Sequence, residues 1–392
     1  MMPLVIGIDI GTSGARAVAM RPDFSIAGQS AVRLDRFGQN PRAPSAWWQA
    51  VQATLTELLS GIDRTAVRAI AVDGTSGTLL PVDASGRPLA EPLMYNDKVD
   101  DADILAAIAR EAPEPSAAHG ATSGLAKALR FQHLPGIAAV LHQADWIAAT
   151  GMRMDLLPDV VEPGDVTGTL TAAIAELFGL LPDVAVVAGT TDGCASFLAT
   201  GATTAGDGVT ALGSSLTIKI LCDRPISAPR FGIYSHRLGD TWLAGGASNS
   251  GGKVLAQHFS LARIIELSAA IDPTTETGLD YYPLGISGER FPIADPTLPP
   301  RLSPRPADDA DYLKAMFEGM AAIEALGYRR LAELGAPALT SVRSVGGGAA
   351  NAAWTAIRQR KLGVDFLPTL SDEAAAGTAR LALKGANKAG LA

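Results

Sequence analysis

Three aspartates stand in short glycine-bearing segments that follow apolar runs, and their positions suggest chemistry on phosphates and hydroxyls. Asp9 lies inside GIDIGTSGARAV (7–18), Asp73 inside VDGTSGTLL, and Asp192 inside GTTDGCAS (189–196). A carboxylate beside phosphates can orient Mg²⁺, usually through water. A carboxylate near a helix N-terminus stays ionised and can accept the proton of a hydroxyl. We therefore predict that Asp9 orients a metal ion and that Asp192 is a general base, although a structural turn or a helix cap would use the same residues.

Two similar turns could hold phosphate groups. The turn Gly11–Gly14 places the hydroxyls of Thr12 and Ser13 beside backbone that can approach a ligand closely. ALGSSLTIKI repeats this pattern in the second half of the chain, with Gly213 and Ser214 in the turn. Backbone amides and hydroxyls in such turns form concave anion sites. Each segment alone could be a plain hairpin, but the two together favour a polyphosphate such as ATP.

A third glycine-rich loop is better suited to a nucleoside than to phosphate. SVGGGAANAAW contains Gly347 and Gly348, on whose flat backbone a purine could lie. Asn351 is expected one turn into the following helix, where its amide could reach the base or the ribose. The alternative is a flexible connection between a strand and a helix.

Loops with hydroxyl and carboxylate groups could bind a polyol. VDGTSGTLLPVD supplies Asp73 and Ser76 after an apolar run, and GGASNSGG (245–252) supplies serines and an asparagine. Such groups can hydrogen-bond the successive hydroxyls of a sugar. Ordinary loops have a similar composition, so polyol binding is a hypothesis for both.

The elements around these residues predict an α/β protein with two similar halves. Each half begins with a strand, a glycine-hydroxyl turn and a second strand, about two hundred residues apart, which suggests a duplicated architecture with a cleft between two lobes. We place the boundary near residue 205, giving lobes 1–205 and 206–392. In the first half, the expected elements are strands at 4–10, 15–20 and 25–34, a helix at 45–61 with Ser45 as its cap, strands within 66–89, a helix ending at 144–150, and a strand and a helix within 181–202. In the second half, they are strands within 207–222, a helix at 309–334, a strand and a helix within 340–363, and a closing helix at 372–385.

The composition excludes several classes of protein. The net charge of −8, from 32 basic and 40 acidic residues among 392, argues against a general nucleic-acid surface. The two cysteines, Cys194 and Cys222, form no disulfide pattern. The sequence has no apolar run of membrane-spanning length and no basic leader at its start. We therefore expect a cytoplasmic protein that binds neither nucleic acid nor membrane.

Taken together, the segments resemble the FGGY family of carbohydrate kinases, within the actin-like ATPase superfamily. The resemblance runs from about residue 4 to 385 and is carried, in order, by GIDIGTSGARAV, AVDGTSGTLLPVD, YND, LPDVVEPG, AGTTDGCAS, ALGSSLTIK, SVGGGAANAAW and LSDEAAAGTARLA. It implies two ribonuclease-H-like lobes and transfer of phosphate from ATP, with Mg²⁺, to a sugar or polyol in the cleft between them. It implies the following roles: Asp192 as the base, Asp9 as the metal-orienting acid, Thr12 and Ser13 at the phosphates, and Gly213, Ser214, Gly347, Gly348 and Asn351 at the nucleotide.

The sugar loop bears on the substrate. Xylulose kinases typically carry a Met-His pair where this chain has DGTSGTLL, which is similar to xylulose-kinase-like enzymes of cyanobacteria and plants that act on D-ribulose. The resemblance therefore implies D-ribulose, with Asp73, Ser76 and Asp192 near the sugar, in a monomer or homodimer. D-xylulose, L-ribulose or a polyol are alternatives within the family, and a non-catalytic ATP-binding module or a related ATPase is an alternative outside it. The segment near Gly151 is shorter than the family pattern, which puts part of the sugar pocket in question.

Overall fold

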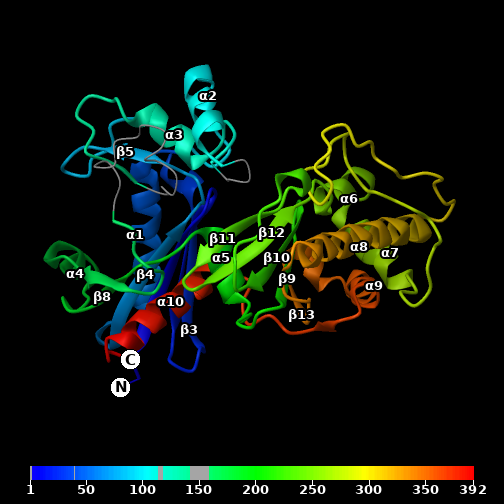
Figure 1. Cartoon of the computed structure of the whole chain (residues 1–392). Coiled ribbons are helices and arrows are strands. Elements are labelled where there is room, and N and C mark those ends of the chain that lie inside the picture. Colours follow the sequence, from blue (N-terminus) through cyan, green and yellow to red (C-terminus); the bar gives the residue numbers. More distant parts are fainter. Residues whose placement is uncertain (1, 39, 114–117, 142–158) are drawn as a thin grey trace. The chain divides into compact units, whose positions relative to one another are not determined.

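The chain folds into two compact units, each built around a six-stranded mixed sheet. The computed structural model describes residues 2–38, 40–113, 118–141 and 159–392 (Figure 1). The first unit comprises Met1–Ala199 and Glu373–Ala392, and the second comprises Thr200–Asp372. The helix end expected at 144–150 and the short segment near Gly151 lie outside the described residues.

The first sheet has the strand order β3-β2-β1-β4-β8-β7. Its strands are β1 (Leu4–Ile10), β2 (Gly14–Met20), β3 (Ile26–Arg33), β4 (Val67–Gly74), β7 (Val166–Thr169) and β8 (Ala185–Val187). β1 runs antiparallel to β2 and parallel to β4, and β4 runs parallel to β8. The first two strands and the turn between them were predicted from the sequence, because an apolar run broken by glycines and hydroxyls is typical of a buried hairpin.

Two helices cover opposite faces of this sheet. α1 (Pro44–Ser60) packs on the face formed by alternate residues of β1, such as Ile6 and Ile8, while α10 (Ala374–Lys388) packs on the face that includes Val5. Successive side chains of a strand point to opposite faces, so the two helices sandwich the sheet. A Cβ on Gly7 would lie 2.1 Å from the Ala375 carbonyl oxygen, so α10 approaches β1 at backbone distance.

The first unit also carries a smaller group of elements beside the sheet (Figure 1). Its members are the two-stranded sheet of β5 (Leu80–Val82) and β6 (Ala139–Leu141), with α2 (Ala102–Glu111) and α3 (Gly124–Phe131). They share an apolar cluster around Leu79, Ile108 and Leu129. The remaining elements of the unit are α4 (Ala172–Phe178), α5 (Asp192–Ala199), η1 (Leu34–Phe37) and η2 (Arg64–Ala66).

The second sheet has the order β11-β12-β10-β9-β13-β14. Its strands are β9 (Asp207–Leu212), β10 (Leu216–Cys222), β11 (Tyr234–Leu238), β12 (Thr241–Ala247), β13 (Ser341–Val345) and β14 (Asp365–Phe366). The helices of this unit are α6 (Gly252–His258), α7 (Leu261–Ala270), α8 (Asp309–Glu333) and α9 (Ala352–Leu362), with η5 (Pro229–Phe231) and η6 (Gly347–Ala350). The core of the unit is rich in aromatic residues, and the rings of Phe317 and Trp354 stack at 5.0 Å.

Two predictions about the architecture need correction. The closing helix does not belong to the second unit: α10 packs on the first, because its small side chains fit a face where Gly377 comes against the Ala195 carbonyl oxygen. The first long helix is not capped by Ser45; its N-cap is Ala43, and Pro44 occupies the first helical position. Proline suits that position because its missing N–H would have no partner inside the helix.

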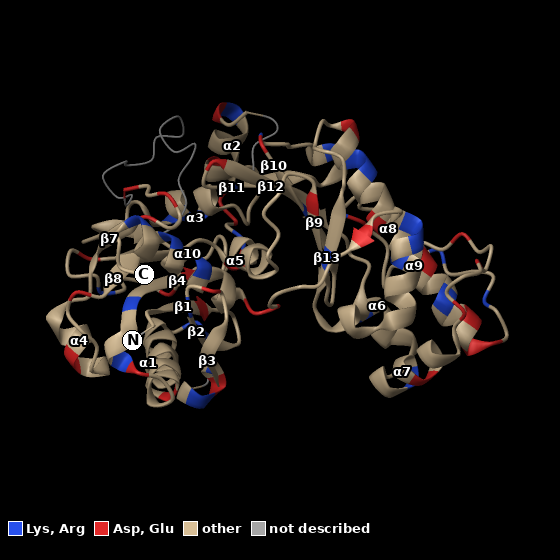
Figure 2. Cartoon of the chain, turned by 90° about the horizontal axis from the view of Figure 1, so that it is seen from below, with Lys and Arg blue, Asp and Glu red and all other residues tan. Residues whose placement is uncertain are grey.

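Charged residues of both signs are distributed over both units. Figure 2 shows Lys and Arg interspersed with Asp and Glu along the elements in that view, as the modest net charge of −8 suggests. Among the described residues, none of the helices combines the length and the apolar character that crossing a membrane requires.

Candidate functional site

The three predicted acids converge at one edge of the first sheet. Asp9 and Asp73 are paired directly across β1 and β4, near the carboxyl ends of both strands. A bridge between Gly74 and Thr191 brings the start of α5 to the same edge, and Asp192 is the first residue of that helix. Carboxyl ends of adjacent parallel strands are where ligands bind in α/β folds. Three segments far apart in the sequence therefore place carboxylates together.

Asp73 is the most deeply placed of the three. It is 3 % exposed, and its Oδ2 accepts a hydrogen bond from the Thr378 hydroxyl of α10. Burial, and then the nearby charges of Asp9 and Asp192, raise the pKa of Asp73 to about 9, so it holds a proton at neutral pH. Its Oδ1 has no donor among the described residues, and with a proton it can itself donate to Asp9.

Asp9 is buried and forms an ion pair with an arginine of the neighbouring strand. It is 4 % exposed, and the Arg16 Nη1 lies 3.2 Å from its Oδ2. The Nε of Arg16 also lies 3.3 Å from the Glu373 carboxylate, where the chain returns to the first unit. Arg16 thus neutralises the acidic edge from the side of β2.

The turn after β1 presents its hydroxyls to solvent. The Gly11 N–H donates to the Gly14 carbonyl at 3.0 Å, and this bond closes the turn. Thr12 and Ser13 between them are exposed. A Cβ on Gly11 would lie 3.6 Å from the Arg16 Nη1, so the turn stands beside the cation that pairs with the acid. Exposed hydroxyls next to a guanidinium are suited to bind phosphate oxygens.

Asp192 is the acid with the greatest access to a ligand. It is half-buried, and its Oδ1 accepts the Gly193 N–H at 2.6 Å. The positive end of the α5 dipole favours its ionised form. The strand before it is fixed at close range, since a Cβ on Gly189 would lie 1.8 Å from the Val72 carbonyl oxygen. A rigid, ionised and accessible carboxylate is what a general base requires.

The acidic edge fits a magnesium ion only if phosphate completes the coordination. Within the described residues, no cluster of three or more His, Cys, Asp or Glu side chains has the geometry of a metal site. Mg²⁺ is usually held by one or two carboxylates together with substrate phosphates and water. The carboxylate of Asp9, which lies 3.2 Å from the Arg16 Nη1, provides one ligand of that kind.

In the second unit, three backbone segments meet at the corresponding turn. Gly213 and Ser214 are exposed between β9 and β10. Gly251 approaches from the segment before α6, and a Cβ there would lie 2.9 Å from the Ser214 carbonyl oxygen. Gly346 has φ +84° and approaches from the end of β13, where a Cβ would lie 3.0 Å from the Leu212 carbonyl oxygen. These contacts leave room for backbone alone.

The triple-glycine loop forms η6 beside this turn. Gly347 faces open space, whereas a Cβ on Gly348 would come within 2.6 Å of the Trp354 ring. The loop therefore has one open side and one side packed on the core. On the open side, no atom of the described residues lies within 4 Å of a Cβ placed on Gly347.

Asn351 was expected one turn into the helix, but it lies directly before the first helical residue. It is the N-cap of α9, where its Oδ1 accepts the Trp354 N–H at 3.0 Å and its Nδ2 donates to the Ser268 hydroxyl at 2.7 Å. Asparagine is among the preferred N-cap residues because it satisfies a free amide of the first turn. Both ends of its side chain are thus used to fix η6 relative to α7 and α9.

The two predicted polyol loops differ in how available they are. Ser76 lies half-buried in a turn closed by a 2.7 Å hydrogen bond between the hydroxyls of Thr75 and Thr78. In the loop 245–252, Ser248 is fully buried and donates to Glu289 at 2.6 Å. The hydroxyl of Ser248 is therefore occupied within the unit, while Ser76 remains accessible.

Sequence reasoning missed two residues of the acidic edge. Strand pairing places Arg16 opposite Asp9, and a hairpin register counted from the turn would have indicated that pair. Thr378 is distant in sequence from Asp73, its partner. Its only signal was a hydroxyl within an alanine-rich helix.

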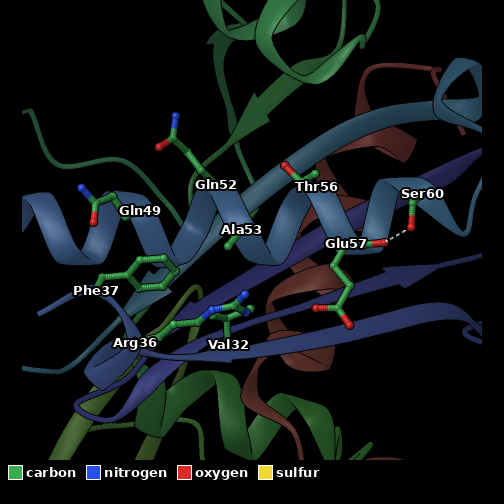
Figure 3. Close-up of a pocket in the computed structure, with 9 residues that line it drawn as sticks. All are labelled: Val32, Arg36, Phe37, Gln49, Gln52, Ala53, Thr56, Glu57 and Ser60. Atoms are coloured by element: carbon green, nitrogen blue, oxygen red, sulfur yellow. Dashed lines mark hydrogen bonds between the residues drawn. The ribbon is translucent and has the colours of Figure 1, made fainter.

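A surface groove of the first unit lies apart from these residues. It runs between α1 and the segment from β3 to η1, as Figure 3 shows. The residues lining it are Val32, Arg36, Phe37, Gln49, Gln52, Ala53, Thr56, Glu57 and Ser60. None of the predicted site residues is among them.

Comparison with known proteins identifies the family to which the chain belongs. Residues 4–111 match the model of the N-terminal domain of the FGGY family of carbohydrate kinases, and residues 201–386 match that of its C-terminal domain. The chain belongs to the FGGY family of carbohydrate kinases. It is 23 % identical to a xylulose kinase of Escherichia coli (strain K12) over 414 residues, covering 90 % of this chain and 83 % of that protein.

A further relative and two solved structures are similar to this chain along most of its length. A xylulose kinase of Staphylococcus epidermidis (strain RP62A) is 22 % identical over 408 residues, covering 90 % of this chain and 81 % of that protein. A structure described as a xyloylose kinase from Brucella ovis superposes with a TM-score of 0.82 at 22 % identity, covering 99 % of this chain and 91 % of that one. Xylulose kinase from Rhodospirillum rubrum gives 0.80 at 22 % identity, with 97 % and 90 % covered. The FGGY kinases share this α/β fold with two sheet-containing lobes.

Proposed function

We propose that this FGGY kinase transfers the γ-phosphate of ATP to the terminal hydroxyl of D-ribulose, giving D-ribulose 5-phosphate. The observation that carries the proposal is the convergence of Asp9, Asp73 and Asp192 at one edge of the first sheet, with Asp192 accessible at the start of α5. The choice of D-ribulose rests on the DGTSGTLL loop that contains Ser76.

Asp192 would act as the base. As the terminal sugar hydroxyl attacks the γ-phosphorus, its proton passes to the Asp192 carboxylate, and the bond from phosphorus to the β-γ bridging oxygen breaks to release ADP. The N-terminus of α5 keeps that carboxylate ionised before the transfer. The Gly193 N–H holds Oδ1 at 2.6 Å, so the side chain is oriented before the sugar binds.

The two turns would hold the phosphates and the nucleoside. Thr12 and Ser13 are exposed beside Arg16 and would contact the phosphate that is transferred. Gly213 and Ser214 would line the phosphates on the second unit, and the open side of Gly347 would face the purine. Asn351 would shape this surface as the cap of α9 rather than contact the nucleotide.

Asp9 would hold Mg²⁺ together with the phosphate oxygens. The ion supplies positive charge that offsets the charge of the polyphosphate when it is bound. The pairing of Asp9 with Arg16 at 3.2 Å keeps the carboxylate turned along the edge of the sheet. Because ATP is the phosphate donor, we keep the prediction of a cytoplasmic enzyme, as a monomer or homodimer.

D-xylulose is the second candidate substrate. The observation in its favour is that several relatives along most of the chain are named xylulose kinases. The two ketopentoses differ only in the configuration at one carbon, so a small change in the sugar loop can select between them.

The test is a coupled ADP-release assay with Mg²⁺-ATP against D-ribulose, D-xylulose, L-ribulose, ribitol, xylitol and glycerol. We expect the highest kcat/KM with D-ribulose. A higher value for D-xylulose would keep the mechanism and overturn the substrate. ADP release that no sugar or polyol stimulates would contradict the proposed reaction itself.

A further inference from the structure

Lys127, on α3, is fully buried, and in the part of the chain that the structure describes its Nζ contacts backbone carbonyls rather than a carboxylate. Its side chain is 0 % exposed, and its Nζ donates to three backbone carbonyls. The acceptors are Gly77 at 2.8 Å, Met94 at 2.7 Å and Tyr95 at 3.1 Å. An ammonium group has three protons, so these contacts account for all of them and leave none for a ligand.

The three carbonyls come from two different loops. Gly77 belongs to the turn 75–78, which carries Ser76, and the other two belong to the turn 94–97. A pair of backbone hydrogen bonds between Leu79 and Leu93, at 2.9 and 3.0 Å, joins the loops at their bases. Lys127 joins them a second time, nearer their tips.

A second charged group, the Asp97 carboxylate, also fixes the turn 94–97. Asp97 accepts the Met94 N–H at 2.8 Å and both Nη atoms of Arg42, at 2.6 and 3.0 Å. Burial alone would raise the pKa of Asp97, but the Met94 N–H and Arg42 outweigh it and keep the pKa below its usual value. Burial lowers the pKa of Lys127, and the Asp97 charge opposes that effect.

The faces of these loops that lie away from Lys127 are available to a ligand. Tyr95 is 51 % exposed, Asn96 is also exposed, and Ser76 is half-buried. Two hydrogen-bonding loops held rigidly relative to each other form a preorganised surface for a polyol, because the ordering cost is met before binding.

We propose that Lys127 is a positioning residue for sugar binding: it fixes the turn 75–78 relative to the turn 94–97 and thereby sets the affinity and selectivity for the sugar. The inference rests on the proposed function, because it takes the turn 75–78 as part of the sugar site. No other side chain offers three donors from a single atom at the end of an apolar stem. A methionine would fill the same space and leave three buried carbonyls without a donor.

The test compares Lys127→Met with Arg130→Met, a matched control that removes an exposed cation from the same helix. We expect Lys127→Met to raise KM for D-ribulose about tenfold or more and to reduce the D-ribulose preference over D-xylulose. KM for ATP should stay within about twofold, since Lys127 contacts neither the turn Gly11–Gly14 nor the residues assigned to the nucleotide in the second unit. Arg130→Met should leave all three quantities unchanged.

The outcomes separate the inference from the proposed function. If the wild-type enzyme shows no sugar-stimulated ADP release, the proposed function is wrong. If the wild-type enzyme is active and folded Lys127→Met keeps its KM and selectivity for sugars, or loses affinity for ATP equally, the inference is wrong. Circular dichroism and thermal unfolding check that the variant is folded.

A second variant decides the matter if Lys127→Met does not fold. Arg42→Met removes the ion pair to Asp97 on the half-exposed side of the same turn. We expect about a threefold rise in KM for the sugar with KM for ATP unchanged. No change in KM for the sugar would overturn the inference.

Discussion

The two sheets carry opposite kinds of side chain at corresponding positions beside their first turns. In the first unit, Asp9 of β1 lies two residues before Gly11 and pairs with Asp73 of β4. In the second unit, the residue two before Gly213 is Ala211, which pairs with Val345 of β13. One arrangement of parallel strands therefore presents carboxylates in one unit and apolar side chains in the other. In the proposed function, the carboxylates of the first unit serve proton transfer and metal binding, and the backbone of the second unit binds the nucleotide.

One buried ion pair of the second unit can also be compared with Asp73 of the first. The second unit buries an ion pair, Arg358 with Glu324 at 2.7 Å, and both side chains are 0 % exposed. The ion pair makes further hydrogen bonds: the Thr210 hydroxyl donates to Glu324, and Arg358 donates to the Ser344 hydroxyl. Thr210 and Ser344 are paired across β9 and β13, one residue further from the turn than Ala211 and Val345. In the first unit, Asp73 keeps one oxygen without a donor among the described residues. The Arg358–Glu324 pair thus finds its partners inside the unit, whereas Asp73 has an oxygen to which no group in the described part of the chain donates.

The comparison predicts that loss of the base is the most damaging change. Asp192→Asn should lower kcat about 10²–10⁴-fold, because the amide cannot accept the hydroxyl proton, while KM for ATP changes little. Steady-state kinetics with D-ribulose and with D-xylulose would measure this. The matched control is Asp183→Asn, which changes an exposed acid in the segment before β8. Normal turnover in Asp192→Asn would show that the acidic edge is not the catalytic side.

The close backbone packing of the first unit predicts a large effect on stability. A Cβ on Gly377 would lie 1.9 Å from the Ala195 carbonyl oxygen, so Gly377→Ala should separate α10 from α5. We expect a loss of about 3 kcal/mol in the free energy of unfolding, at the upper end of typical overpacking costs. Urea denaturation would measure it. Gly124→Ala on α3, where nothing lies within 4 Å of the new methyl group, should leave stability nearly unchanged.

Acid should destabilise the second unit through one histidine. Burial, and then the charge of Lys219, lower the pKa of His236 to about 4. Its ordinary pKa of 6.5 applies in the unfolded chain, so its contribution to stability is complete above pH 6.5 and is lost as the pH falls towards 4. Between pH 7 and pH 5 this loss should be about 2 kcal/mol.

His236→Phe tests whether His236 causes the acid sensitivity, because phenylalanine cannot bind a proton but keeps a ring beside Tyr234. In the wild-type protein the centroids of the His236 and Tyr234 rings are 5.3 Å apart. The free energy of unfolding of this variant should fall less than that of the wild-type protein over the same pH range. Parallel curves for the two proteins would assign the acid sensitivity to other groups.

The hydroxyls of the two turns predict the smallest effects and separate the two turns by kinetics. Ser13→Ala should lower kcat several-fold, and Ser214→Ala should raise KM for ATP several-fold, each corresponding to about 1 kcal/mol for one hydrogen bond. Both residues are exposed, so stability should not change. Identical kinetic effects of the two substitutions would remove the distinction between the turns.

Most of the strands and helices could be predicted from local patterns. The hairpin of β1 and β2, the helix α8 and the start of α5 follow from apolar periodicity and glycine turns. Asp9 and Asp192 were identified as candidate acids because they interrupt or follow buried strands. Their mutual proximity followed from the resemblance to a kinase family rather than from the residues alone.

What escaped prediction depends on partners distant in sequence. Nothing local shows that Thr378 reaches Asp73 or that Lys127 joins two loops, because both contacts are made through tertiary packing. The assignment of the closing helix to the second lobe was wrong for the same reason, since the packing of an alanine-rich helix against the first sheet is not visible in its own sequence. The cap role of Asn351 had a local signal, its position just before the helix, which the resemblance to a nucleotide loop outweighed.

The return of α10 to the first sheet has a consequence for biosynthesis. Thr200–Asp372 is one continuous stretch, whereas the first unit needs Glu373–Ala392 to complete it. Chains are made from the N-terminus and domains fold as units, so the second unit can finish folding on the ribosome while the first waits for its last helix. Thr378, the partner of Asp73, emerges after the whole of the second unit. The acidic edge is therefore assembled only after the second unit has been synthesised, and a nascent chain stalled before Glu373 would lack it.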